Sequence, residues 1–116
     1  MDEIREPTFV VLVALANGPR HGYGLIQDVE RLSSGKVRLR PGTLYATLDR
    51  LSSKGLIETA GEEVVEGRLR RYYRLTSAGS AVLEAESKQR LTVATEALRR
   101  LRVTGGASRR LAGGLS

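Results

Sequence analysis

The sequence predicts a mainly α fold that carries one small β-hairpin and ends in a long C-terminal helix. Three observations support this prediction. Apolar residues recur at helical spacing in segments before residue 55, whereas apolar and charged residues alternate near residue 70, as in a strand. A final apolar stripe between residues 82 and 101 again has helical spacing. With 116 residues, the chain has room for one compact domain and one helix that needs a partner.

Composition excludes several classes of protein. Hydrophobic residues make up 41% and charged residues 28%, which is typical of a folded domain. The absence of cysteine and the single histidine, His21, exclude disulfides and multi-histidine metal centres, so we expect no metal and no cofactor. The longest apolar run, Phe9 to Ala16, is too short to span a bilayer, and the acidic N-terminus lacks a signal-peptide layout. We therefore expect a cytoplasmic protein without membrane association, and the net charge of +6 favours a polyanionic partner.

The first helix is expected over residues 9–16, with Thr8 as its N-cap. Its β-branched residues would also suit a buried strand, and periodicity cannot separate the two over so short a run. Pro7 before the run and Asn17-Gly18-Pro19 after it favour a helix, since this is how helices begin and end. The alternative, a hairpin turn at Asn17-Gly18, lacks an alternating strand after it.

Two further helices follow. The second comes after His21-Gly22-Tyr23-Gly24, with Leu25, Val29 and Leu32 on one face, and we place His21 at its start. The third runs from about Pro41 to Lys54, because proline fits a first helical turn and Gly55 a C-cap. Its apolar face is formed by Leu44, Leu48 and Leu51. We expect a single outward stripe, hydroxyls first and cations after them, formed by Thr43, Thr47, Arg50 and Lys54.

The hairpin is expected from two short strands. Residues 56–59 form the first strand, residues 60–67 an acidic turn region bounded by glycine, and residues 69–75 the second strand. Alternation puts Tyr72 and Tyr73 on opposite faces, and Tyr73 is the one expected to pack inward. The ribbon carries four arginines, which are Arg68, Arg70, Arg71 and Arg74.

This order of elements is that of a winged helix-turn-helix, which we place at residues 5–75. In this architecture the third helix enters the major groove of DNA and the ribbon contacts the backbone or a neighbouring minor groove. Between Lys36 and Arg74 the chain has nine Lys or Arg against five Asp or Glu, so much of the positive charge lies in the segment that would face DNA. The side chains predicted to contact DNA are Tyr23, Arg40, Thr43, Tyr45, Ala46, Thr47, Arg50, Lys54, Arg68 and Arg70.

The sequence also resembles the PadR family of bacterial regulators. The resemblance covers about residues 5 to 100, and its motifs are His21-Gly22-Tyr23, Leu39-Arg40-Pro41-Gly42-Thr43-Leu44-Tyr45, Leu48-Asp49-Arg50-Leu51, Lys54-Gly55-Leu56-Ile57 and Arg70-Arg71-Tyr72-Tyr73-Arg74-Leu75-Thr76, with Gly79 beyond them. It implies a homodimeric winged-helix DNA binder, commonly a repressor, that dimerises through C-terminal helices and responds to a small molecule or another cue. It also implies that Tyr23 and Tyr45 lie near the DNA backbone.

We place the C-terminal dimerisation helix at residues 76–103, capped by Thr76, and a disordered tail at residues 104–116, which contain two glycine pairs. A helix of this length would extend about 42 Å, more than the width of so small a domain, so part of it should pack on a second chain. The residues predicted to form this homodimer interface are Leu83, Leu91, Ala94, Leu98 and Leu101.

Together with the resemblance, these features predict a sequence-specific transcriptional regulator that binds a pseudo-palindromic operator as a homodimer. We expect a repressor that is released by a small molecule or another signal. The alternative is a winged-helix module that binds another protein. That module would tolerate Thr47→Ala and Arg50→Ala without loss of duplex binding. An enzyme is not expected, because the sequence has no nucleophile–histidine–acid set, metal cluster or complete Gly-rich phosphate loop.

Overall fold

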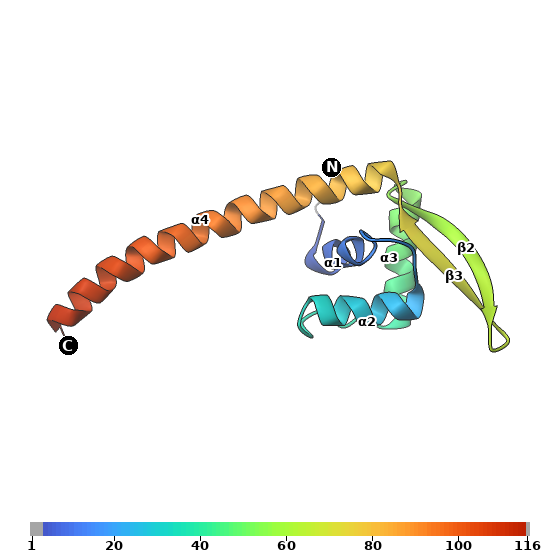
Figure 1. Cartoon of the computed structure of the whole chain (residues 1–116), viewed down its shortest axis with the longest axis horizontal. Helices are drawn as coiled ribbons and strands as arrows, with labels where there is room; N and C mark the ends of the chain where they lie inside the picture. The colour runs from blue at the N-terminus through green and yellow to red at the C-terminus, as the bar shows by residue number, and fades with distance from the viewer. Residues whose placement is uncertain (1–3, 116) are drawn as a thin grey trace. The chain divides into compact units, whose positions relative to one another are not determined.

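The computed structural model describes residues 4–115, with side chains described over residues 4–103. Within this range the elements, in chain order, are α1 (Glu6–Ala14), β1 (Arg20–His21), α2 (Gly22–Leu32), α3 (Pro41–Ser53), β2 (Ile57–Val65), β3 (Arg68–Leu75) and α4 (Ser77–Leu115). The strands form an antiparallel sheet in the order β1-β3-β2, and the β2–β3 hairpin projects away from α1, α2 and α3 (Figure 1). The mainly α fold with a small hairpin is confirmed.

Helix α1 lies at the centre of the core. Its apolar residues do not form one stripe, and Val11 and Leu12 are completely buried, because neighbours cover the helix on several sides. The helical interpretation of this segment is confirmed, but its start is not. Arg5 is the N-cap and Pro7 lies within the first turn, where its missing N–H costs nothing. Thr8 is therefore inside the helix and not its cap.

Helices α2 and α3 pack their apolar faces into the core, but Leu32, predicted to lie on the apolar face of α2, is 40% exposed at the end of the helix. Leu25 and Val29 of α2 and Leu44 of α3 are fully buried. The core extends into the sheet and into the first turns of α4, with the buried residues Val10, Val11, Leu12, Ala14, Leu15, Leu25, Val29, Val37, Leu44, Leu48, Leu51, Ile57, Tyr73 and Leu83. Tyr73 is thus the inward-facing tyrosine of the ribbon, as the sequence predicted.

The hairpin is longer than the sequence indicated. Residues 60–65, expected in a turn region, belong to β2, and the turn consists only of Glu66 and Gly67. Both have positive φ, 51° and 76°, as in the tight turns that match strand twist. The prediction was wrong because Glu62 and Glu63, read as loop residues, lie opposite Arg71 and Arg70 and are stabilised there by opposite charge.

Strand β1 was not predicted at all. Arg20 pairs with Tyr73 and His21 with Tyr72, so this two-residue strand adds an edge to the hairpin. So short a strand has no periodicity of its own, and its partner strand lies about fifty residues further along the chain. We call the β2–β3 hairpin the wing. The pairing of β1 with β3 joins the start of α2 to the wing by backbone hydrogen bonds.

Thr76 and Gly79 join the wing to α4. The Thr76 hydroxyl donates to the Gly55 carbonyl at 2.6 Å and accepts from the Gly79 N–H at 3.0 Å, which confirms Thr76 as a helix cap. Gly79 itself lies against the carbonyl group of Leu56, and a Cβ at Gly79 would be 2.9 Å from that carbonyl carbon. The close approach requires glycine at this position.

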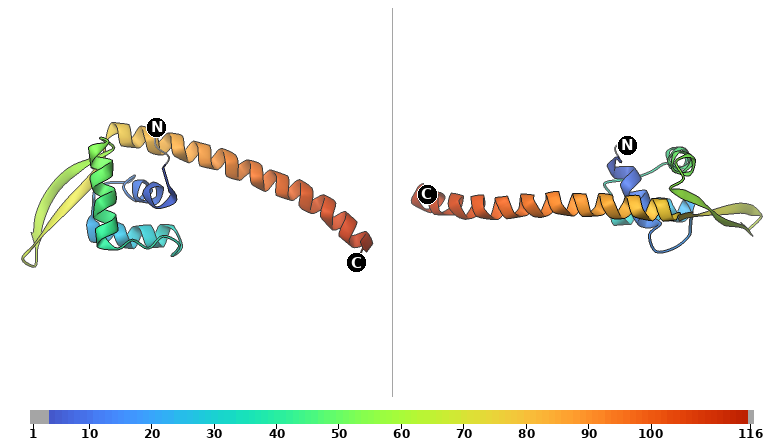
Figure 2. Two further views of the ribbon diagram at one scale, coloured as in Figure 1. Left: turned by 180° about the vertical axis from the view of Figure 1, so that it is seen from behind. Right: turned by 90° about the horizontal axis from the view of Figure 1, so that it is seen from above.

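The chain divides into two compact units, Met1–Glu84 and Ala85–Ser116. Helix α4 begins in the first and continues without a break through the second, as both views in Figure 2 show. Leu83, predicted at a dimer interface, is buried in the core of its own unit. That prediction is wrong because the first turns of α4 complete the winged-helix core. Over the described residues, no helix is long and apolar enough to cross a membrane.

The predicted end of the last helix at Val103 is also wrong, since α4 reaches Leu115. Glycines such as Gly105 and Gly106 weaken a helix by about 1 kcal/mol each but, unlike proline, leave its hydrogen-bond ladder complete. Side chains beyond Val103, and Ser116 entirely, lie outside the described residues. Because α4 includes residues 104–115, the disordered tail predicted there is wrong up to Leu115.

Candidate nucleic-acid interface

A cleft of about 670 Å³ opens between the N-terminus of α2, helix α3 and the tip of the wing. Its walls are His21, Gly22, Tyr23, Tyr45, Val65, Glu66, Arg68, Leu69, Arg70 and Arg71. Four side chains predicted to contact DNA, Tyr23, Tyr45, Arg68 and Arg70, are therefore brought together here from separate elements. Phenolic hydroxyls and guanidinium groups both donate hydrogen bonds, which suits an anionic ligand such as a phosphodiester.

The two tyrosines face solvent. The side chain of Tyr23 is 65% exposed and that of Tyr45 is 47% exposed. Tyr23 therefore does not pack at the edge of the core. The Tyr45 hydroxyl rests on Gly22, and a Cβ there would be 2.9 Å from the Cζ atom of Tyr45. Gly22 thus lets a side chain of α3 reach the N-terminus of α2, where unpaired N–H groups favour anions.

The exposed surface of α3 agrees with the sequence prediction at most positions. Thr43, Ala46, Arg50 and Lys54 are exposed, as is Arg40, the N-cap residue before the helix. Small side chains near the N-terminus allow close approach to base edges, and the cations can reach phosphates on either side.

Thr47 is the exception. Its side chain is only 5% exposed, and its hydroxyl donates to the Thr43 carbonyl at 3.0 Å. The prediction that Thr47 faces outward is wrong, because this position comes three residues after Leu44 and four before Leu51, on the apolar side of the helix. That spacing was already present in the sequence.

The arginines of the wing are largely matched by glutamates. Arg74 pairs with Glu58 at 2.9 Å and Arg71 with Glu62 at 3.2 Å, while Arg70 lies 3.9 Å from Glu63. The hydrogen bond that the Arg71 guanidinium donates to Glu62, with a smaller contribution from Tyr73, raises the pKa of Arg71. Counting arginines along the sequence therefore overestimated the positive charge of the wing.

Arg68 differs from the other wing arginines. Its side chain is exposed beside the turn, and it forms no ion pair within the part of the chain that the structure describes. Its guanidinium is free to bind an anion without first breaking an internal pair. Arg68 is therefore the wing cation best placed to contact a phosphate.

His21 organises the inner wall of the cleft. Its Nδ1 atom accepts the Gly24 N–H at 3.1 Å and so caps α2, and its ring meets that of Tyr72 edge-on at 5.5 Å. Burial lowers the pKa of His21 below the usual value of 6.5, and the positive charges of Arg70 and Arg20 lower it further. The neutral ring is the form that can accept the capping hydrogen bond. The prediction of His21 as a helix-start residue is confirmed.

Within residues 4–103, no group of three or more His, Asp or Glu side chains is arranged to hold a metal ion. The cleft has the hydrogen-bond donors of a binding surface. The order of the elements is that of a winged helix-turn-helix, with α1, α2 and α3 followed by the wing. Exposed tyrosines and cations surround α3, as in a regulator of this class.

Comparison with known proteins identifies the family. Residues 11–85 match the model of the transcriptional regulator PadR-like family, and the chain belongs to this family. The proteins of the family are transcriptional regulators and not enzymes, as the sequence analysis expected.

The relatives agree with this assignment. The chain is 40% identical over 88 residues to the transcriptional regulator Rv3488 of Mycobacterium tuberculosis, covering 76% of this chain and 78% of the relative. It is 34% identical over 84 residues to the transcriptional regulator YqjI of Escherichia coli, covering 72% of this chain and 39% of that longer protein.

Solved structures show the same fold. A PadR family regulator from Clostridium difficile R20291 superposes with a TM-score of 0.65 at 25% identity, covering 82% of this chain and 96% of that one. Bacillus subtilis PadR, whose structure is a complex with operator DNA, superposes with a TM-score of 0.62 over 70% of this chain and 47% of that one. At 20% identity, this second likeness shows the fold alone.

Proposed function

We propose that this regulator binds duplex DNA sequence-specifically as a homodimer, and that it represses transcription by occupying a pseudo-palindromic operator. The observation that carries the proposal is the cleft, in which exposed Tyr23 and Tyr45 lie opposite Arg68 beside the exposed face of α3. Membership of a family of transcriptional regulators supports it, as does the operator complex of Bacillus subtilis PadR.

The roles of the side chains follow from their positions. Helix α3 enters the major groove, where Thr43 and Ala46 are small enough to approach base edges and carry the sequence preference. Arg40, Arg50 and Lys54 bind phosphates that flank the groove. The cleft binds a further stretch of backbone, with the hydroxyl groups of the two tyrosines donating to phosphate oxygens.

Dimerisation rests on the second unit. Leu91, Ala94, Leu98 and Leu101 recur at intervals of three and four residues along α4, and each is exposed in the single chain. An apolar stripe of this spacing is typical of a helix that packs on another helix. A second copy of the chain would cover it, and the two-fold axis would place two α3 helices on an inverted repeat.

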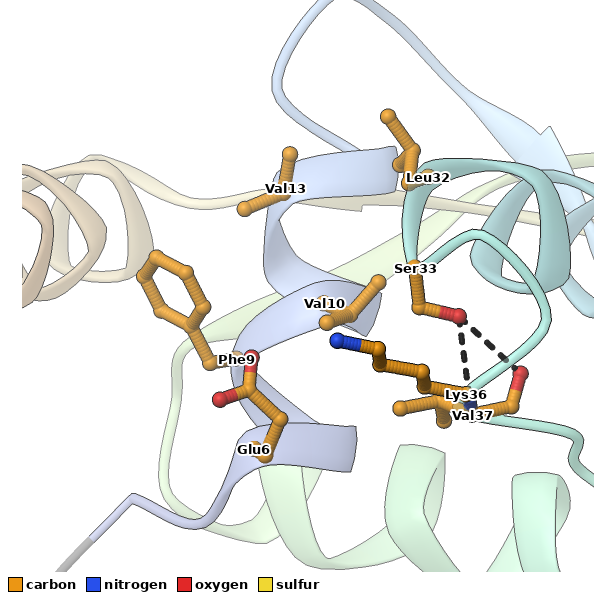
Figure 3. A pocket seen from close by; sticks show the side chains of 8 residues that line it. All are labelled: Glu6, Phe9, Val10, Val13, Leu32, Ser33, Lys36 and Val37. Atoms are coloured by element: carbon orange, nitrogen blue, oxygen red, sulfur yellow. Dashed lines mark hydrogen bonds between the residues drawn. The ribbon is translucent and has the colours of Figure 1, made fainter. Parts of the chain in front are cut away.

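A small-molecule effector would complete the proposed regulation, and the first unit contains one candidate site for it. A pocket of about 400 Å³ lies between α1 and the end of α2. Figure 3 shows the side chains that line it. Phe9, Val10 and Val13 form one wall, and the side chain of Lys36 extends from the opposite side toward α1. This volume is within the usual range for small-molecule sites, and the wall would suit an apolar body.

A fluorescence-anisotropy titration against the protein's own upstream region tests DNA binding. We expect nanomolar affinity that falls steeply with salt, because cations on the protein displace counterions from phosphates. Arg68→Ala should reduce the salt slope by about one while leaving the sequence preference unchanged. Equal affinity for unrelated duplexes would contradict sequence-specific binding and favour a protein-binding module instead.

A further inference from the structure

Helix α3 carries a single acidic residue, Asp49, on the side that faces away from the core. The other residues at helical spacing on this side are Gly42, Ala46 and Ser53, and all four are exposed. The buried leucines of α3 lie on the opposite side. No heavy atom lies within 4 Å of a Cβ added at Gly42, which agrees with its outward position. We call these four residues the outer ridge of α3.

Asp49 has the only charged side chain of the outer ridge. Helical spacing places Tyr45 along one border of the ridge and Arg50 and Lys54 along the other. When a helix lies in the major groove, its middle line meets the base edges, whereas side chains along its borders reach the phosphates. Asp49 therefore faces base edges in the proposed complex, two helical turns after the small residue Gly42.

The Asp49 carboxylate is unpaired. It forms no ion pair or hydrogen bond with any residue that the structure describes. The positions three and four residues away along α3 hold only uncharged side chains, and the neighbouring Arg50 directs its guanidinium to the Thr47 hydroxyl at 3.4 Å. Glutamates of the wing such as Glu58 and Glu62 are instead matched by arginines. The acceptor atoms of Asp49 are thus available to a donor outside the chain.

The chemistry of a carboxylate restricts which base edge it can contact. An ionised carboxylate only accepts hydrogen bonds. In the major groove, guanine and thymine present acceptors, and adenine places the acceptor N7 beside its amino group. Cytosine alone presents an amino donor without an adjacent acceptor. A carboxylate on the ridge would repel phosphates near any sequence, and a cytosine is the base that compensates for this repulsion best.

We propose that Asp49 is a specificity-determining residue that accepts a hydrogen bond from the N4 amino group of one cytosine in each half-site. Ala46 and Ser53, its neighbours on the outer ridge, are small enough to let this short side chain reach a base edge. The inference rests on the proposed DNA binding and adds to it one base that α3 recognises.

Parallel selections of bound duplexes from one random pool test the assignment. The wild type should enrich cytosine at one position of each half-site, whereas Asp49→Ala should enrich no base at that position and keep the preferences at all others. Glu66→Ala is the charge-matched control, because it also removes one exposed carboxylate but lies in the turn of the wing. It should bind every duplex more tightly and leave the selected sequence unchanged.

Anisotropy titrations then measure the size of the effect. The probes are the duplex that the wild type selects and the same duplex with the enriched C·G pair of each half-site replaced by T·A, which exchanges the amino donor for an acceptor. The replacement should weaken binding of the wild type and of Glu66→Ala about tenfold or more, and binding of Asp49→Ala less than twofold. Circular dichroism shows whether each variant is folded.

The outcomes separate this inference from the proposed function. If Asp49→Ala selects the same bases as the wild type, or if the base that it no longer selects is not cytosine, the assignment is overturned while DNA binding stands. If Asp49→Ala loses its preference at every position, the residue only positions α3, and the assignment is again overturned. If the wild type binds no duplex specifically, the proposed function itself fails.

Discussion

Replacing Gly79 by alanine sets two physical effects against each other. Alanine is favoured over glycine in a helix by at most about 1 kcal/mol, so propensity alone predicts a more stable protein. In the structure, the new Cβ would overlap the carbonyl group of Leu56. Overpacking against groups that cannot turn aside costs up to about 3 kcal/mol. We therefore expect a net loss of about 2 kcal/mol, or a melting temperature lower by about 8–16 °C for a unit of this size.

Gly42→Ala is the matched control. Gly42 also lies in the first turn of a helix, but no heavy atom lies within 4 Å of its added Cβ. Here only helix propensity acts, and it stabilises the protein by about 1 kcal/mol at most. The melting temperature should therefore stay the same or rise by a few degrees. Thermal unfolding followed by circular dichroism at one fixed protein concentration compares the two variants. A Gly79→Ala protein as stable as the wild type would refute the close packing of α4 on Leu56.

Three further predictions follow from the site and from α4. Thr47→Val should change duplex affinity by no more than about twofold and should lower the free energy of unfolding by about 1 kcal/mol, because one hydrogen bond is lost. Thr43→Val should instead weaken discrimination between duplexes. Anisotropy titrations and urea unfolding measure both, and a loss of duplex affinity in Thr47→Val would show that Thr47 contacts DNA. Lowering the pH below about 6.5 should reduce the free energy of unfolding, because the unfolded state binds a proton at His21 more readily than the folded state, whose lowered pKa keeps the ring neutral. This loss of unfolding free energy should continue until the pH falls below the lowered pKa of His21 in the folded state. It should be smaller in His21→Asn, because asparagine can still cap α2. If the urea midpoints of the wild type and of His21→Asn fall equally between pH 7.5 and 5.5, His21 is not the cause. Leu98→Lys should weaken self-association about ten- to hundredfold, measured by sedimentation equilibrium, whereas the control Leu32→Lys should not. Equal dimer stability in the two variants would exclude the apolar stripe of α4 as the interface.

Much of the fold could be predicted because its signals are local. The proline at the start of α3, the apolar stripe of that helix and the inward position of Tyr73 depend on spacing that is visible within a few residues. The length of the wing was missed because Glu62 and Glu63 resemble loop residues until their partners on β3 are known. β1 was missed for the same reason, since its pairing is entirely long-range.

The candidate site was predicted where exposure follows from helical spacing. Thr43, Tyr45 and Arg50 face outward as expected, and the error at Thr47 came from reading a polar residue type as an exposed position. Leu83 was misplaced because an apolar stripe does not reveal which part of it packs within its own chain.

The central claim is that two α3 helices, related by a two-fold axis, recognise one operator. Selection of bound duplexes from a random pool tests it most directly. The account predicts enrichment of an inverted repeat whose half-sites are about 10 base pairs apart, centre to centre, or a multiple of that spacing. Enrichment of a single asymmetric site, or of no sequence at all, would contradict it.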